Sequence, residues 1–227
     1  MLRMRTSSRR DVGRAAKWSV VALACLLAAS GCSAQDAESR PDHLCEIADP
    51  SDERDLLRQI VRSDEFDTQI STTTERLVDR LKGDLRTMPS DDETSPWLVC
   101  GYVPTQRKDT GRVRLQVRWQ PHSHREGTPE GSVPFEANGA VGRANDVGSL
   151  LRVRCDMPGD LRSLSDAAVL SVEGSFGIST PRTDMVQADR DRQTTLTYFM
   201  ARRVTEALGC ENKPLEQAPV VKPLPTP

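Results

Sequence analysis

Four cysteines carry the most definite chemistry in this sequence: Cys45, Cys100, Cys155 and Cys210. A zinc site would need closely spaced ligands, whereas an even number of distant cysteines is typical of disulfides in exported proteins. We therefore predict two disulfides. Pairing in sequence order, Cys45 with Cys100 and Cys155 with Cys210, would close two loops of 55 residues. The rival pairing joins Cys45 to Cys210, and the sequence leaves both open.

Two histidines form the next candidate site. His122 and His124 lie in a stretch rich in glycine and proline, residues 120–147, which we predict to be a long mobile loop. Alternating residues of an extended chain can face one metal ion, and Glu126 or Glu130 could complete a zinc site. Solvated loop histidines are the simpler interpretation, so we expect neither a metal nor another cofactor.

No familiar catalytic motif is present. The chain has three histidines and lacks the GxSxG, HExxH, SxxK and Walker sequences. Acidic clusters such as Asp91-Asp92-Glu93 lie where carboxylates cap helices or remain solvated. Trp97 and Trp119 could line a ligand groove, although strand aromatics more often form the core. We assign no catalytic residue, and name these tryptophans with His122 and His124 as candidate binding residues.

The first 32 residues suggest where the protein works. A basic segment precedes ten apolar residues, Val20–Ala29, which would span roughly 15 Å as a helix, about half of a bilayer core. Small residues then lead to Ser30-Gly31-Cys32. This segment resembles the signal peptide and lipobox of bacterial lipoproteins, apart from Ala29, where the family more often has leucine. Ser8-Arg9-Arg10 also partly resembles a twin-arginine signal, so the Sec and Tat export routes both remain open.

The lipobox resemblance implies a membrane anchor. Residues 1–31 would be removed as a signal peptide, and Cys32 would carry diacylglycerol and palmitate at the extracytoplasmic face of the cell membrane. One acyl chain alone binds membranes only marginally, whereas several chains anchor a protein stably. The alternative is a soluble secreted product, because ordinary secretory signals also end in small residues.

Charge argues against nucleic acid as a partner. The formal charge of the whole chain is −2, and removal of residues 1–31 would leave 25 basic and 32 acidic residues, a charge of −7. Such a surface repels phosphate backbones at long range. Most basic residues are arginines, and this bias resembles that of actinobacterial lipoproteins.

Hydrophobic periodicity predicts one domain after the anchor. A polar spacer, residues 32–44, would precede a domain at 45–210, and a proline-rich tail at 211–227 would be disordered. Within the domain, apolar stripes predict helices, and alternating or β-branched stretches predict strands. The expected helices cover residues 49–61, 72–85 and 189–208, and the expected strands cover 97–103, 113–119, 149–155 and 168–178.

This order, α-α-β-β-β-β-α, predicts an α+β fold in which helices pack on one face of a four-stranded antiparallel sheet. With an anchor and without a catalytic motif, the chain is expected to be a non-enzymatic binding module for a partner protein or a cell-envelope ligand. A lipid-anchored enzyme that acts on cell-wall or extracellular substrates is the alternative.

Overall fold

The computed structural model describes residues 42–105, 111–124, 129–177 and 187–225. These residues form an α+β domain with four α-helices, one 3₁₀ turn and one eight-stranded antiparallel sheet. The helices are α2 (Asp52–Val61), α3 (Thr74–Thr87), α4 (Arg162–Ser165) and α5 (Gln187–Leu208). The strands are β1 (Phe66–Ile70), β2 (Trp97–Pro104), β3 (Arg112–Pro121), β4 (Val133–Ala137), β5 (Ala140–Ala144), β6 (Gly148–Val153), β7 (Ala168–Gly177) and β8 (Val221–Pro223).

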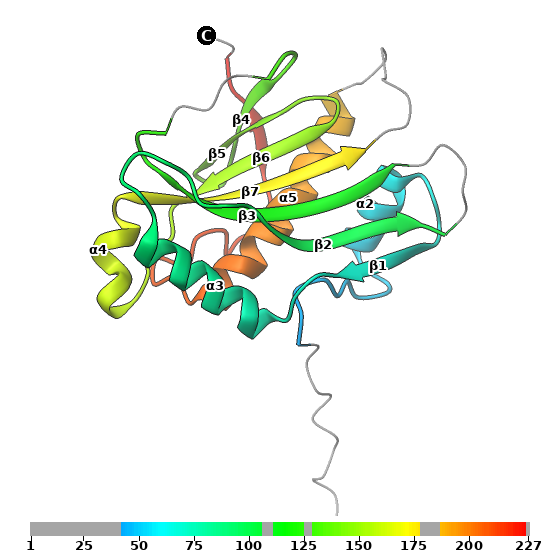
Figure 1. Cartoon of the computed structure of the whole chain (residues 1–227). Helices are drawn as coiled ribbons and strands as arrows, with labels where there is room; N and C mark the ends of the chain where they lie inside the picture. The colour runs from blue at the N-terminus through cyan, green and yellow to red at the C-terminus, as the bar shows by residue number, and fades with distance from the viewer. Residues whose placement is uncertain (1–41, 106–110, 125–128, 178–186, 226–227) are drawn as a thin grey trace, which may run out of the picture. The chain divides into compact units, whose positions relative to one another are not determined.

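The sheet is ordered β1-β2-β3-β7-β6-β5-β4-β8, as the ribbon in Figure 1 shows. The four expected strands are present as β2, β3, β6 and β7, but a four-stranded sheet is wrong. Residues 120–147, expected to be a loop, include the hairpin of β4 and β5. Its turn, Asn138-Gly139, has φ angles of 48° and 85°. Both are positive, as a two-residue type I′ turn requires.

Two more strands escaped the sequence analysis because their side chains are poorly buried. β1 is exposed from its second residue onward, so it carries no alternating apolar pattern. β8 has three residues and pairs with β4, and the backbone N–H of Leu224 donates to the carbonyl of Pro134 at 2.9 Å. Leu215 is buried in the core. The prediction of a disordered tail is therefore wrong for residues 211–225.

The helices begin at local capping signals. Ser51 caps α2 by accepting from the backbone N–H of Arg54, and Thr73 caps α3 by accepting from that of Arg76. The serine and threonine hydroxyls satisfy free N–H groups of the first turn. The two helices therefore begin at Asp52 and Thr74, two or three residues after the expected starts at residues 49 and 72. Helix α5 ends before Gly209, whose φ of 74° fits a C-terminal cap.

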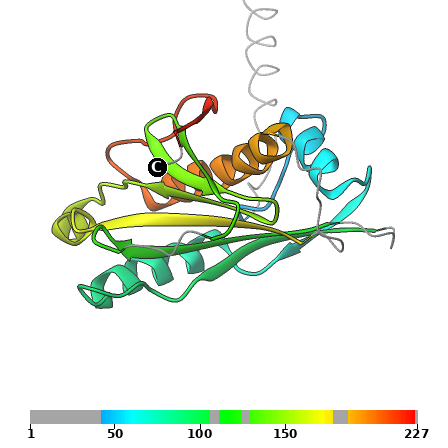
Figure 2. The same ribbon diagram turned by 90° about the horizontal axis from the view of Figure 1, so that it is seen from above.

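One face of the sheet is closed by helices. Val113, Leu115, Val117 and Trp119 alternate along β3 and are buried, and the register places β7 and β6 side chains beside them. The Trp119 indole N–H donates to the carbonyl of Leu81 in α3 at 2.9 Å, whereas Thr197 of α5 hydrogen-bonds Ser149 of β6. Because the sheet twists, the same face turns toward α3 at one end and toward α2 and α5 at the other (Figure 1 and Figure 2).

Two disulfides tie this closed face together. Cys45 bonds Cys100 of β2, and Cys155, which follows β6, bonds Cys210 after α5. The prediction of two disulfides is confirmed, and of the pairings that the sequence left open the structure has the one in sequence order. Disulfides persist in oxidising compartments, which indicates an extracytoplasmic location. Among the described residues, no helix is long and apolar enough to cross a membrane.

Candidate functional site

The opposite face of the sheet carries a polar groove of about 560 Å³. Side chains of β3, β5, β6 and β7 line it, together with residues from the segments before β2 and after β3. These side chains occupy the strand positions that alternate with the core, so the register that buries Val117 and Val172 turns Arg118 and Glu173 outward. The groove follows directly from one polar face of the antiparallel sheet.

Glu93 organises one wall of the groove. Its carboxylate lies 2.9 Å from a guanidinium nitrogen of Arg118, accepts from Gln120 Nε2 at 2.8 Å and lies 3.4 Å from His124 Nε2. The next residue is held as well, because the Thr94 N–H donates to the carbonyl of Trp119 at 3.0 Å. The segment before β2 is therefore fixed across the end of β3. Arg118 also lies 3.9 Å from Glu173 of β7.

The opposite rim is the turn between β5 and β6. Asn145 shapes it, because its side-chain oxygen accepts from the N–H groups of Val147 and Gly148 at 3.1 and 2.9 Å. Such an Asx turn exposes the residue at its tip, and 48% of Val147 is exposed. Arg143 of β5 and Leu150 of β6 line the groove beside this turn. The lining thus combines charged, amide, hydroxyl and a few aliphatic groups.

The structure separates the two candidate histidines. His124 lines the groove, whereas the His122 backbone N–H donates to the carbonyl of Ala167 and its side chain is exposed. Glu126 lies outside the described residues, and Glu130 is exposed. In the part of the chain that the structure describes, no group of three or more His, Cys, Asp or Glu residues is placed to hold a metal ion.

The two candidate tryptophans belong to the closed face. Trp119 is fully buried under α3, so it belongs to the core and does not line a ligand groove. Trp97 is partly buried, donates from its indole N–H to Asp84 of α3 at 2.5 Å and lies beneath the guanidinium of Arg80. Neither indole lines the groove. Both therefore hold α3 on the sheet.

A partly buried polar cluster lies under the beginning of the domain. Arg203 of α5 pairs with Glu53 of α2 and donates to the carbonyl of Leu44 at 3.1 Å. The Tyr102 hydroxyl donates to the carbonyl of Cys45 at 3.1 Å. Burial raises the pKa of Glu53 although Arg203 opposes the shift, and burial raises the pKa of Tyr102 to about 12. The cluster fastens the start of the domain to β2 and α5, and we assign it a structural role.

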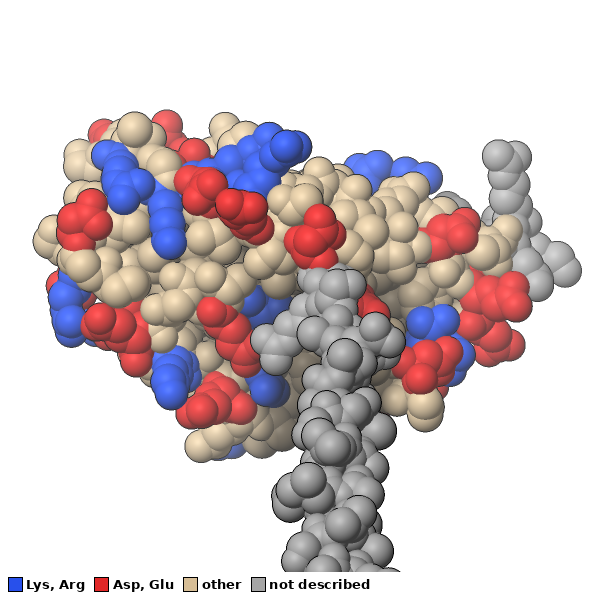
Figure 3. Space-filling model, turned by 90° about the horizontal axis from the view of Figure 1, so that it is seen from below, with Lys and Arg blue, Asp and Glu red and all other residues tan. Residues whose placement is uncertain are grey.

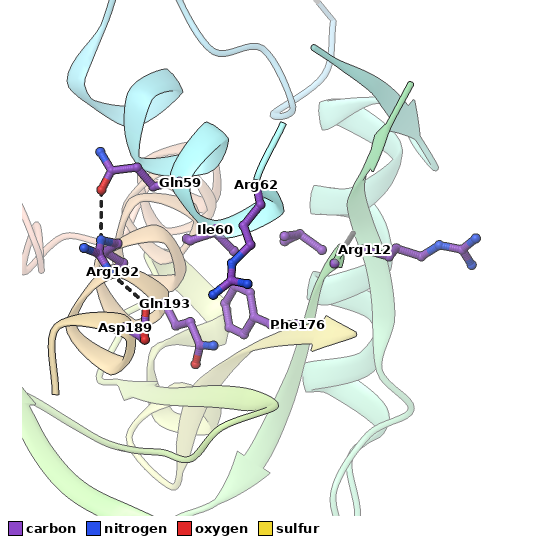
Figure 4. Close-up of a pocket in the computed structure, with 10 residues that line it drawn as sticks. Gln59, Ile60, Arg62, Arg112, Phe176, Asp189, Arg192 and Gln193 are labelled. Atoms are coloured by element: carbon purple, nitrogen blue, oxygen red, sulfur yellow. Dashed lines mark hydrogen bonds and ion pairs between the residues drawn. The ribbon is translucent and has the colours of Figure 1, made fainter. Parts of the chain in front are cut away.

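A second hollow lies between α2, the first turns of α5 and the paired strands β3 and β7, as Figure 4 shows. Arg192 donates to Gln59 at 2.9 Å and pairs with Asp189 at 2.7 Å along its wall. Its volume of about 30 Å³ suits one or two water molecules rather than an organic ligand. The groove on the open face is therefore the larger candidate.

The groove contains parts of a catalytic site without their usual connection. His124 and Glu93 resemble the base and the orienting acid of a hydrolase, and Ser132 lines the same groove. A nucleophile, however, must reach its base by a hydrogen bond. Among the described residues, no hydroxyl or thiol group hydrogen-bonds the His124 side chain.

Comparison with known proteins identifies no relative: no protein-family model, no curated protein and no solved structure matches this chain. The residues that build the groove were also missed by the sequence analysis, apart from His124. Glu93 was grouped with acids that cap helices or remain solvated, and Arg118 lay inside the expected strand 113–119, where it alternates with apolar residues, without a role assigned to it. The alternation was the available signal for Arg118, but it does not show which strand lies beside β3.

Proposed function

We propose that this protein is a lipid-anchored extracytoplasmic binding module, which takes up a cell-envelope ligand or partner on the open face of its sheet. The lipobox resemblance at Cys32 supports the anchor, and the two disulfides support an oxidising compartment. The observation that carries the binding role is the groove of about 560 Å³ on the polar sheet face. Ligand sites commonly occupy clefts of about 300–1,000 Å³ with a few fixed polar groups.

Rigidity of the groove supports binding. Glu93 accepts from or pairs with three side chains. Backbone hydrogen bonds also hold Thr94 to Trp119 of β3 and His122, just after β3, to Ala167. A preformed polar site loses less conformational entropy when a ligand binds. The ligand would meet fixed donors and acceptors instead of a loop that must first become ordered.

An enzyme that acts on envelope material is the second candidate, and the pairing of His124 with Glu93 favours it. The absence of a hydrogen-bonded nucleophile among the described residues makes us prefer binding. A His124→Ala variant separates the two. If the protein is a binding module, the variant retains its ligand, and neither protein releases soluble fragments from envelope material. If the native protein releases such fragments and His124→Ala does not, the protein is an enzyme.

The anchor is tested in cells. A Cys32→Ser variant is expected to appear in the medium or to remain as an uncleaved precursor, because the acyl chains can no longer be attached. Fractionation followed by mass spectrometry of the N-terminus measures both outcomes. A correctly processed, lipid-free protein that remains in the membrane fraction would refute the lipoprotein proposal.

The binding face is tested by sedimentation of the soluble Cys32→Ser protein with envelope fragments from the producing cells. Ser175 is exposed at the groove, so Ser175→Trp should obstruct the groove and abolish most of the sedimented signal. The matched control is Ser163→Trp, an equal change at an exposed position of α4. The proposal is contradicted if the native protein does not sediment with envelope fragments, or if Ser175→Trp sediments with them to the same extent.

A further inference from the structure

The open sheet face has a charge opposite to that of the whole domain. On its central strands β3, β5, β6 and β7, the register places five arginines and one acidic residue on this face. The arginines are Arg112, Arg114, Arg118, Arg143 and Arg152, and the acid is Glu173. Glu93 adds a second negative charge from the segment before β2. The outer strands add Asp67, Glu136 and Lys222 to the same face, which leaves six basic residues against four acids. The face therefore has a local positive charge on a chain whose formal charge after signal removal is −7.

Three of these arginines, Arg112, Arg114 and Arg152, differ from many arginines elsewhere because they have no acidic partner among the described residues. Away from this face, many arginines lie against acids, for example Arg86 with Asp160, Arg162 with Glu211 and Arg202 with Glu206. On the side of the molecule shown in Figure 3, basic and acidic side chains accordingly lie next to one another.

On the open face, Arg112 and Arg114 are exposed, and neither has an acidic partner among the described residues. Arg152 contacts only the carbonyl of Pro121 there, at 3.4 Å, and its buried Nε atom has no hydrogen-bond partner in the described structure. Guanidinium groups that lack acids on a common face are available to an external anion.

Their spacing favours an extended ligand. Arg112 and Arg114 are two residues apart on one strand, so their Cα atoms lie about 7 Å apart. Arg152 lies about 10 Å across the sheet from β3, and about 13 Å further along the strands than the position opposite Arg114. We propose that the open face, the site of the proposed function, binds an extended polyanion that carries phosphate or carboxylate groups at repeated intervals. Arginine suits both groups, because its planar fork can donate two hydrogen bonds to either anion.

The shape of the groove favours a polymer over an anionic bilayer. Arg118 is recessed, with 18% of its side chain exposed, beside the wall that Glu93 holds. A flat lipid surface cannot enter such a groove, whereas a chain one residue wide can. The net negative charge of the domain does not prevent contact, because the Debye length is about 8 Å at physiological ionic strength and distant acids are screened.

The test uses the full mature chain in its Cys32→Ser form with long-chain inorganic polyphosphate and polyglutamate as probes. We expect binding of at least one probe that weakens as salt is added. Loss of charge-assisted hydrogen bonds should lower affinity about tenfold for each arginine, so Arg112→Glu with Arg114→Glu should reduce it about a hundredfold. Arg118 is left intact because it positions Glu93.

The matched control is Arg76→Glu with Lys82→Glu on α3, which changes the net charge equally and should alter affinity by less than about twofold. Absence of binding to both probes, equal losses in both variants, or binding only to phosphatidylglycerol vesicles would each overturn the polyanion proposal. If Ser175→Trp abolishes envelope sedimentation but added polyphosphate does not compete with it, the polyanion proposal is overturned and the proposed function stands.

Discussion

On β3, Val113, Leu115 and Val117 turn toward the helices, whereas Arg112, Arg114 and Arg118 turn to the other face. The first set is buried and packs under helices that two disulfides tie to the sheet. The second set lies at a groove or in solvent without helices above it. The same strands thus supply stability on one side and recognition on the other, so substitutions on the two sides should have separable effects.

The largest effect is expected from the closed face, on removal of a disulfide. Cys155→Ala with Cys210→Ala opens a 55-residue loop, and the chain-entropy model predicts a loss of about 4 kcal/mol in the free energy of unfolding. Denaturant titration of the native and variant proteins measures the loss. A change below about 1 kcal/mol would mean that residual structure in the unfolded chain replaces the constraint.

Packing beneath α5 provides the second test. A Cβ atom at Gly174 would lie 2.6 Å from Thr197 Oγ1 and 2.7 Å from Phe176 Cζ. Gly174→Ala should therefore destabilise the domain by about 1–3 kcal/mol. Gly83→Ala is the control, because Gly83 lies inside α3 and the added Cβ would meet no atom within 4 Å apart from the nearby backbone of its own helix. It should stabilise by about 0.5–1 kcal/mol. Similar effects at both positions would contradict the close packing of α5.

The buried Tyr102 predicts a loss of stability in alkali. Burial raises the pKa of Tyr102 from the ordinary tyrosine value of 10.0 to about 12 in the folded protein, so the unfolded chain ionises first and stability falls as the pH rises from 10 to 12. The loss attributable to Tyr102 should reach about 1.4 kcal/mol near pH 11.

Tyr102→Phe should lower stability at neutral pH, where the hydrogen bond to Cys45 is lost, and should reduce the alkaline decline. Denaturation at about pH 8 and about pH 11 measures the difference. An unchanged alkaline slope would show that Tyr102 does not remain protonated in the folded state.

The smallest effect on stability is expected on the open face. Arg114→Glu changes an exposed residue without an acidic partner in the described structure, so the free energy of unfolding should move by less than about 0.5 kcal/mol. The same variant should weaken envelope binding. If Arg114→Glu unfolds the domain, the two faces are not separable as we describe them.

Local patterns were sufficient for the elements that bury a regular stripe. The alternation from Val113 to Trp119 predicted β3, and the apolar spacing from Leu196 to Leu208 predicted α5, because burial of one face imposes its period on the sequence. The pattern failed for β1, which is mostly exposed, and for β4, β5 and β8, whose glycines, prolines and short lengths conceal pairing. Edge and hairpin strands are stabilised by backbone partners that a single segment does not reveal.

The sequence by itself determined the candidate anchor at Cys32, the α+β class and the number of disulfides, since each depends on residue type or local period. Only the tertiary structure decided which cysteines meet, that Trp119 belongs to the core, and that Glu93 reaches Arg118, Gln120 and His124. The groove joins residues from Glu93 to Ser175. Such a site depends on strand order, because neighbours across a sheet are set by long-range backbone pairing, which the identity of each residue leaves undetermined.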